Sequence, residues 1–172
     1  GRTPEKITRL YEESCADNDG ENPDEKNARM LQIAHPLTTE QLYMVDYQLY
    51  TPSSTMYNLY SMMKLDLDIY DMESLASAMQ SVIRSHPALL TTYFWNEDGE
   101  LAQKYTPEIL QDIRVEKLSE FEFKFVKDSL VYPFKIIGGK LFRCRVFETE
   151  KSGYIFFDVH HSLFDGTSLK IL

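Results

Sequence analysis

The 172-residue sequence has few cysteines, a deficit of basic residues and no long apolar run. Its two cysteines, Cys15 and Cys144, are too few for a disulfide framework and lack the spacing of metal ligands. Free thiols are typical of a reducing compartment, so we expect a cytoplasmic location. No apolar run approaches the roughly 20 residues that cross a bilayer, and residues 1–5 lack the apolar stretch of a signal peptide. We therefore expect no membrane partner.

The charge balance argues against a second class of partner. The chain carries 18 lysines and arginines against 27 aspartates and glutamates, a net charge of −9. Binding to nucleic-acid phosphates needs a basic surface, so we expect no nucleic-acid partner. What the sequence does contain is apolar: 43% of its residues are hydrophobic and 13% are aromatic, which is typical of a globular domain.

The first 36 residues differ from the rest of the chain. Residues 4–13 have apolar side chains at helical spacing, with Pro4 suited to the first turn of a helix. Residues 17–25 are polar, acidic and rich in turn-forming residues, which is typical of a solvated linker. The sequence therefore predicts a linker over residues 1–36 and a folded domain over residues 37–172.

Helix and strand patterns alternate along the predicted domain. Three predicted helices begin after the N-capping residues Thr38, Asp71 and Ser119, and end near Tyr50, residue 85 and Val131. Strand patterns cover residues 56–67, 89–95, 101–105, 113–117, 141–148 and 154–159. An Asp-Gly pair between the second and third of these strands predicts a hairpin. This mixture predicts an α/β fold in which helices flank a mixed sheet.

The most chemically distinctive segment follows the last predicted strand. Residues 155–159 are mostly apolar and run directly into His160 and His161. Enzymes of the α/β class place reactive groups at strand ends. Neighbouring residues that leave a strand point to opposite sides, so we predict that one ring packs inside while the other faces a cavity. Further on, Asp165 is placed to orient a ring or pair with an arginine, and Gly166 leaves room for a close approach to the main chain.

Two adjacent histidines alone are a weak signal, since such pairs are common on surfaces and in hydrogen-bonded cores. Zinc binding is a poor alternative, because His35 and His86 lie at no useful ligand spacing. The longer string is more specific. His-His-x-x-x-Asp-Gly after an apolar strand, here residues 160–166, resembles the signature of condensation domains of nonribosomal peptide synthetases and of the wider chloramphenicol acetyltransferase-like acyltransferases.

Three further stretches resemble condensation domain motifs, in the family's order. Residues 37–41 are similar to the first motif, which usually has Ser or Thr followed by Ala-Gln. Residues 57–93 resemble the run Tyr-Asn, helix, Arg-His-Glu-x-Leu-Arg-Thr-x-Phe. Residues 133–143 are similar to the Pro-Phe-Asp-Leu and Gly-Pro-Leu-Phe-Arg run. The resemblance covers residues 36–172.

The sequence departs from the family at two positions. Ser85 and Leu90 stand where the family usually has arginine. The resemblance implies an arginine that pairs with Asp165, so a different arginine is expected to do so here. The candidates are Arg84, Arg143 and Arg145.

The resemblance implies amide bond formation between a carrier-bound acyl or peptidyl thioester and a carrier-bound aminoacyl amine in nonribosomal peptide synthesis. It gives His161 the catalytic role, as a base or as a group that positions the amine, with His160, Asp165 and Gly166 in support. A backbone amide near Gly166 is a candidate oxyanion donor. The implied partners are donor and acceptor peptidyl carrier domains and an adjacent adenylation domain in the parent chain. No metal or bound cofactor is implied, because the phosphopantetheine arms enter on the carriers.

The implied fold is one lobe, the N-terminal subdomain, of a two-lobed chloramphenicol acetyltransferase-like fold, with the second lobe after Leu172. On that basis, residues 3–14 are a candidate for the last helix of a preceding carrier domain. We expect the 172-residue chain alone to be inactive, and to self-associate through the face that a second lobe covers. Two other classes of function stay open: a free-standing coenzyme A-dependent acyltransferase, and a non-catalytic platform that recruits carriers. An epimerisation domain is a related third possibility.

Overall fold

The computed structural model describes residues 33–164, which lie within one unit of the chain, Ile33–Leu172. The predicted N-terminal helix and most of the predicted linker lie outside these residues, as do Asp165 and Gly166. Over the described range, no helix is both long enough and apolar enough to cross a membrane. Over the same range, no three His, Cys, Asp or Glu side chains gather as a metal site.

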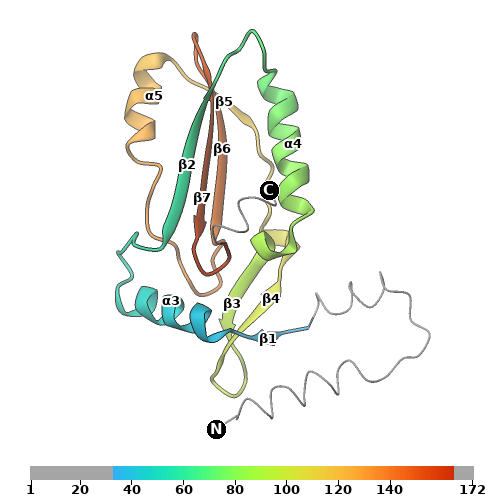
Figure 1. Cartoon of the computed structure of the whole chain (residues 1–172), viewed down its shortest axis with the longest axis vertical. Coiled ribbons are helices and arrows are strands. Elements are labelled where there is room, and N and C mark those ends of the chain that lie inside the picture. Colours follow the sequence, from blue (N-terminus) through green and yellow to red (C-terminus); the bar gives the residue numbers. More distant parts are fainter. Residues whose placement is uncertain (1–32, 165–172) are drawn as a thin grey trace, which may run out of the picture. The chain divides into compact units, whose positions relative to one another are not determined.

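Two β-sheets organise the described residues (Figure 1). The larger has the strand order β2 (Asn58–Leu65), β7 (Gly153–His160), β6 (Phe142–Glu148) and β5 (Val115–Lys117). Strand β7 is antiparallel to both of its neighbours, and β5 is parallel to β6. The smaller sheet is antiparallel, in the order β1 (His35–Pro36), β4 (Leu101–Tyr105) and β3 (Thr91–Trp95). The predicted strands and hairpin are confirmed, while the two-residue β1 has no sequence signal of its own.

The α-helices begin where their capping residues predict. They are α3 (Thr39–Tyr50), α4 (Met72–Arg84) and α5 (Glu120–Lys127). Thr38 and Ser119 each form a full capping box, and the Asp71 side chain accepts a hydrogen bond from the backbone of Ser74.

Strands β2 and β5 are shorter than the predicted ranges 56–67 and 113–117, and two other predicted boundaries are wrong for local reasons. Helix α5 ends at Lys127, before the predicted Val131, because the backbone and hydroxyl of Ser129 both donate to the Val126 carbonyl and close a tight turn. The strand predicted from residue 89 begins at Thr91, because Pro87 opens a short 3-10 helix, η1 (Pro87–Leu90). A second 3-10 helix, η2 (Pro107–Ile109), follows β4.

Helices α4 and α5 cover opposite faces of the four-stranded sheet (Figure 1). Alternation along β7 creates these faces. Ile155 packs with Met72 of α4, whereas Phe156 packs with Phe123 of α5. A strand buried on both faces has an almost continuous apolar sequence, as residues 155–159 do.

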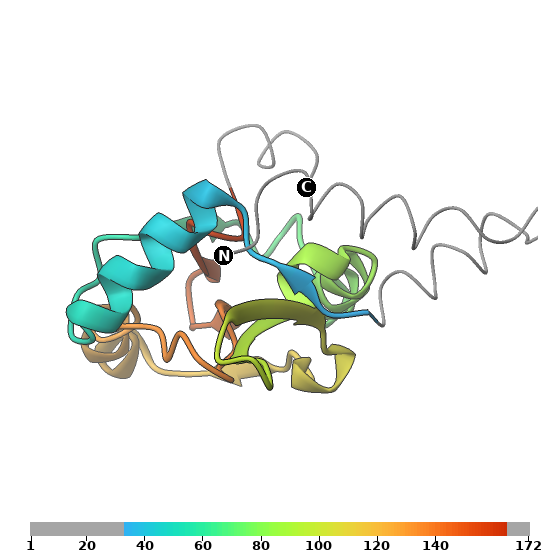
Figure 2. The ribbon, with the colours of Figure 1, turned by 90° about the horizontal axis from the view of Figure 1, so that it is seen from below.

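Residues 133–141 join the two sheets. The backbone N–H of Gly138 donates to the Tyr93 carbonyl of β3 at 2.8 Å. Leu141 and Phe134 pack with Tyr93 in a core cluster that also includes Val45 of α3. Figure 2 views the end of the unit where this cluster lies, with α3 in cyan and the β3–β4 hairpin in green and olive. The end of β7 lies on this core.

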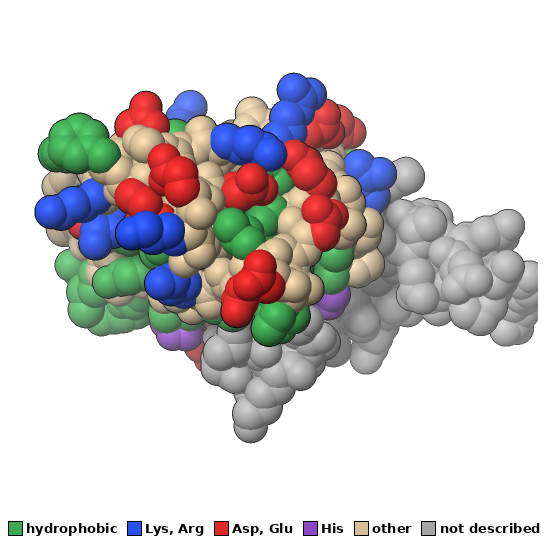
Figure 3. All heavy atoms as spheres, turned by 90° about the horizontal axis from the view of Figure 1, so that it is seen from above, with side chains coloured by type: hydrophobic (Ala, Val, Ile, Leu, Met, Phe, Trp, Pro, Cys, Tyr) green, Lys and Arg blue, Asp and Glu red, His purple; other side chains and the backbone are tan. Residues whose placement is uncertain are grey.

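Two surface regions differ in character. Strand β2 is at an edge of its sheet, and no strand among residues 33–164 pairs with its outer side. Its Tyr60 and Met63 side chains are 63% and 51% exposed. At the end of the unit opposite to the end of β7, acidic and basic side chains are interspersed (Figure 3). Because Tyr60 and Met63 are exposed on it, the β2 edge is the kind of apolar edge that tends to pair with another strand.

Gly139 gives a test of the segment that joins the sheets. A Cβ at this position would lie 2.0 Å from the carbonyl oxygen of Lys135, and that backbone atom belongs to the same segment. We expect Gly139→Ala to lower the free energy of unfolding by about 1–3 kcal/mol, as overpacking does. Urea denaturation of the 172-residue chain measures this loss.

Gly138 provides the matched control, one residue away. It has a φ of +67°, and nothing lies within 4 Å of its Cβ position. Asparagine tolerates this left-handed conformation, so we expect Gly138→Asn to cost less than Gly139→Ala. An equal loss in the two variants would show that the close approach to Lys135 is not the cause.

Candidate active site

The two histidines at the end of β7 occupy different environments. His160 is the last residue of the strand and is fully buried, whereas the side chain of His161 is partly exposed. The backbone N–H of His160 donates to the Leu141 carbonyl, and that of His161 donates to the Tyr57 carbonyl, each at 2.8 Å. The predicted difference between an inward and an outward ring is therefore present.

The partner of His161 determines which ring nitrogen carries its proton. Nδ1 of His161 lies 2.9 Å from the carbonyl oxygen of Phe164. A carbonyl oxygen only accepts hydrogen bonds, so Nδ1 carries the hydrogen and donates it. Nε2 of the neutral ring then keeps its lone pair. This is the form in which an imidazole accepts a proton from a substrate.

His160 has the opposite tautomer. Its Nδ1 lies 2.7 Å from the Ser162 hydroxyl and accepts from the Ser162 backbone N–H at 3.3 Å. A backbone N–H only donates, so Nδ1 is unprotonated and the hydrogen is on Nε2. Nε2 has no hydrogen-bond partner in the described part of the chain, and the rings of Tyr57 and Phe134 lie with their centroids 5.9 Å from the imidazole.

Burial keeps His160 neutral. It lowers the pKa of this ring from the usual 6.5 to about 4, and the neighbouring His161 acts in the same direction. His160 is therefore uncharged at neutral pH. The pair consists of a neutral buried ring beside a ring that is available for proton transfer.

A chain of polar side chains from other elements reaches the turn that follows β7. The buried Tyr93 hydroxyl of β3 donates to the Ser162 hydroxyl at 2.9 Å. Nε2 of Gln41, in the first turn of α3, donates to the Ser162 carbonyl at 3.2 Å, and Gln41 also exchanges hydrogen bonds with Gln103 of β4. Burial raises the pKa of Tyr93 to about 12, so its hydroxyl remains a donor.

An ion pair lies on the same face of the sheet as His160. Nη1 of Arg143 on β6 is 2.5 Å from Oδ2 of Asp158 on β7, and both side chains are almost completely buried. Asn58 of β2 donates to the same carboxylate oxygen at 2.9 Å. The guanidinium lies between the rings of Tyr132 and Phe134, 3.5 and 3.8 Å from their centroids.

Asp158 and its partners were not predicted as site residues. The signal was nevertheless in the sequence, because a carboxylate inside an otherwise apolar strand needs a buried cation or hydrogen-bond donors. Burial raises the pKa of Asp158, while the Asn58 hydrogen bond and Arg143 act in the opposite direction. Ser162 was also not predicted, although a hydroxyl between His161 and two apolar residues is a similar signal.

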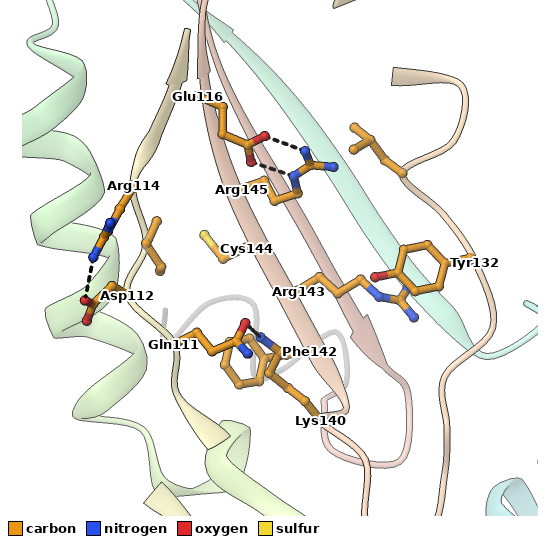
Figure 4. A pocket seen from close by; sticks show the side chains of 12 residues that line it. Gln111, Asp112, Arg114, Glu116, Tyr132, Lys140, Phe142, Arg143, Cys144 and Arg145 are labelled. Carbon is orange, nitrogen blue, oxygen red and sulfur yellow. Dashed lines mark hydrogen bonds and ion pairs between the residues drawn. The ribbon is translucent and has the colours of Figure 1, made fainter. Parts of the chain in front are cut away.

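Two of the three candidate arginine partners of Asp165 already have carboxylate partners. Arg143 pairs with Asp158, and Arg145 forms a two-pronged hydrogen bond with Glu116 at 2.7 and 2.5 Å. Figure 4 shows Arg145 directed toward Glu116 and Arg143 beside the ring of Tyr132. Asp165 lies outside the described residues, so its pairing stays a prediction.

The pocket in Figure 4 has a volume of about 320 Å³ and lies along the edge of β6 that β5 leaves open. Cys144 lines it, and burial raises the pKa of this thiol to about 12. A thiol of this kind is protonated at neutral pH and is not a nucleophile. Neither histidine of the pair lines this pocket.

Comparison with known proteins agrees with the family that the sequence motifs resemble. The model of the family described as "Condensation domain" matches residues 32–172. A linear gramicidin synthase of Brevibacillus parabrevis is 30% identical over 146 residues, which cover 80% of this chain and 3% of that protein. Surfactin synthase subunit 1 of Bacillus subtilis is 31% identical over 142 residues, which cover 82% of this chain and 4% of that protein. The chain belongs to the condensation domain family.

Solved structures show the same fold. The starter condensation domain of rhizomide synthetase matches 81% of this chain with a TM-score of 0.65 and 16% identity. The first condensation domain of the calcium-dependent antibiotic synthetase, solved with a substrate analogue, matches 80% of the chain with a TM-score of 0.63 and 19% identity. The chain spans 35% of each of these structures. The predicted fold, a mixed α/β lobe of the chloramphenicol acetyltransferase-like type, is confirmed.

His160 makes the stability of the chain depend on pH. Since its pKa is about 4 in the fold and 6.5 ordinarily, only the unfolded chain gains this proton as the pH falls from about 6.5 to about 4. The free energy of unfolding is therefore unaffected by His160 above this window. Within the window it falls, by at most about 3 kcal/mol.

Melting temperatures of wild type and His160→Gln between pH 7 and pH 4.5 test this. The carboxylates that titrate in this range are common to both proteins, so the difference between the two curves reports on His160. We expect the wild type to lose stability more steeply as the pH falls. Parallel curves would show that His160 is not held neutral by the fold.

Proposed function

We propose that this chain carries the histidine-bearing lobe of a condensation domain that forms amide bonds in nonribosomal peptide synthesis. The substrates are a carrier-bound acyl or peptidyl thioester and the amine of a carrier-bound aminoacyl group. The observation that carries the proposal is the state of His161, whose Nδ1 is engaged by the Phe164 carbonyl while Nε2 keeps its lone pair. The relatives named above are synthases of gramicidin and surfactin, which favours condensation over a coenzyme A-dependent transfer.

The chemistry needs little beyond a proton acceptor and positioning. A thioester is already activated, so the enzyme need not form a covalent intermediate. The acceptor amine attacks the thioester carbonyl, a C–N bond forms and the C–S bond breaks. The proton leaves the amine for Nε2 of His161 and then passes to the departing sulfur. Holding both carrier arms at this point lowers the activation barrier further, because the amine and the thioester are already in reacting position.

The remaining roles belong to the same proposal. His160 supports the site as a neutral, buried ring. Asp165 supports it through an ion pair, and a backbone amide near Gly166 donates to the oxyanion. Donor and acceptor peptidyl carrier domains bring the phosphopantetheine arms, an adenylation domain lies in the same parent chain, and the domain itself binds no metal or organic cofactor. The cysteine content supports a cytoplasmic location.

The test of this function uses His161→Ala in the parent synthetase. We expect single-turnover formation of the amide between loaded carriers to fall by at least about 100-fold, the lower end of what general base catalysis contributes. Loading of the carriers should not change. His86→Gln serves as the control, because Nδ1 of His86 lies 2.6 Å from the Val82 carbonyl of α4 and His86 takes no part in the polar contacts of the turn after β7. A rate near that of the wild type for His161→Ala would refute the assignment.

We also propose that the 172-residue chain is inactive alone and self-associates through the β2 edge. An edge strand with exposed apolar side chains tends to pair with a second copy, and lysines on such an edge oppose pairing. Strand β2 carries one lysine, Lys64, near its end, so two further lysines at its centre should weaken pairing. We expect the variant with Met62→Lys and Met63→Lys to be more monomeric than wild type in sedimentation velocity. The variant with Phe121→Lys and Phe125→Lys makes an equally drastic change at two exposed positions of α5 and should have no such effect. A wild-type monomer at all concentrations, or amide formation by that monomer, would contradict this proposal.

A further inference from the structure

In the turn after β7, the hydroxyl of Ser162 joins the ring of His160 to the neighbouring sheet. Its hydroxyl lies 2.7 Å from Nδ1 of His160 and accepts a hydrogen bond from Tyr93 at 2.9 Å. Because the Tyr93 hydrogen occupies the oxygen from one side, the hydrogen of Ser162 is available for Nδ1 of His160. The donors therefore all point the same way, from Tyr93 through Ser162 to His160.

Burial gives this chain of hydroxyls its importance. Tyr93 is 0% exposed, Ser162 is 7% exposed and His160 is 0% exposed, so water does not substitute for a lost partner. The Tyr93 hydroxyl is itself held, because Nε2 of Gln41 lies 3.5 Å from it. Tyr93 comes from β3 and Gln41 from α3, so two separate elements fix the position of the turn.

We propose that Tyr93 and Ser162 are positioning residues of this active site. They hold His160 as the neutral tautomer with hydrogen on Nε2. They also hold the turn whose Phe164 carbonyl fixes the tautomer of His161. The proposal extends the function proposed above and rests on it for its effect on rate, but its statement about His160 stands independently.

The physical consequence for His161 is electrostatic. If the Ser162 hydroxyl were absent, Nδ1 of His160 would keep only the weaker 3.3 Å backbone hydrogen bond. A proton could then bind at Nδ1 more readily, and a charged ring next to His161 would make His161 a poorer base. The hydroxyl therefore protects the basicity of the neighbouring ring, particularly on the acid side of neutral pH.

Burial and the neighbouring His161 both favour a neutral His160 ring, but neither selects one tautomer over the other. Among the described residues, the polar, charged and aromatic groups on its face of the sheet, or packed against it, are Tyr57, Asn58, Asp158, Arg143 and Phe134. The two charged groups, Asp158 and Arg143, neutralise each other as an ion pair. The tautomer of His160 is therefore set by Ser162, through its hydroxyl at 2.7 Å and its backbone N–H at 3.3 Å.

Nitrogen chemical shifts of the imidazole rings provide a direct test in the 15N-labelled 172-residue chain. For wild type we expect His160 to show protonated Nε2 and bare Nδ1 from pH 8 down to about pH 5. For Ser162→Ala we expect a mixture of tautomers or a titration at least one pH unit higher. Ser162→Thr, which restores a hydroxyl, should return the wild-type spectrum, and Tyr93→Phe should lie between the two.

Ser77→Ala and Tyr60→Phe are matched controls. Ser77 lies on the exposed side of α4 and Tyr60 is 63% exposed on β2, so each loses a hydroxyl without contact with His160. Both should give the wild-type His160 signals. A wild-type His160 with hydrogen on Nδ1, or a Ser162→Ala variant with an unchanged tautomer and titration, would overturn the proposal.

The rate of amide formation in the parent synthetase tests the functional half. We expect Ser162→Ala and Tyr93→Phe to slow single-turnover condensation by roughly 3- to 10-fold at pH 7, the range that one lost hydrogen bond gives. The acid limb of the pH profile should move to higher pH, and Ser162→Thr should reverse both changes. An altered tautomer with an unchanged rate and profile would refute the positioning role. If even the wild type forms no amide, the proposed function fails, while the nitrogen shifts still decide the inference about His160.

Discussion

The buried ion pair between Arg143 and Asp158 is the interaction on which this end of the sheet depends. The two side chains lie on adjacent strands in direct register, β6 and β7, and the guanidinium also donates to the Pro133 carbonyl at 3.0 Å. Removing one partner of such a pair leaves an uncompensated buried charge and typically costs about 3–5 kcal/mol. The pair therefore does more than join two strands that already pair through their backbones. It fastens the segment after α5 to the surface of the sheet, through the carbonyl of Pro133 and the rings on either side of that residue.

This fastening determines what surrounds His160. Phe134 stacks on Arg143 and also lies edge to face with the His160 ring, so the position of one ring follows from the other. A few residues later, Gly138 binds the Tyr93 backbone of β3, and Leu141 accepts from the His160 backbone. One short segment thus contacts both sheets. It sets the distance between Tyr93, on the smaller sheet, and the histidine pair, on the larger one.

The sequence predicted much of this fold, because its local signals agree with the tertiary structure. The capping boxes at Thr38 and Ser119 and the alternation along the strands are local features, and the structure contains both. The errors have local causes that outweigh pattern, such as the turn at Ser129 that ends α5 early. The polar contacts of the site could not be predicted in the same way. Tyr93 and Ser162 are 69 residues apart, and no spacing rule relates a residue on β3 to a turn after β7. Asp158 was not predicted for a different reason. Sequence reasoning considered Arg143 as a partner of Asp165, and so left the carboxylate of Asp158 without an assigned partner.

The adjacent histidines illustrate how one short sequence obtains two different chemical groups. The rings have the same intrinsic chemistry, and the strand directs them to opposite sides. Beyond that, the difference comes from what each Nδ1 meets: an acceptor-only carbonyl for His161, and a donor-only N–H with a hydroxyl for His160. A carbonyl forces hydrogen onto Nδ1 and leaves Nε2 as a base, whereas the donors do the reverse and leave no buried lone pair at Nε2. Since the Phe164 carbonyl and the Ser162 hydroxyl belong to the same turn, any force that shifts this turn alters both tautomers together. The chemistry of the pair is therefore a property of the turn and of the two elements, α3 and β3, that hold it.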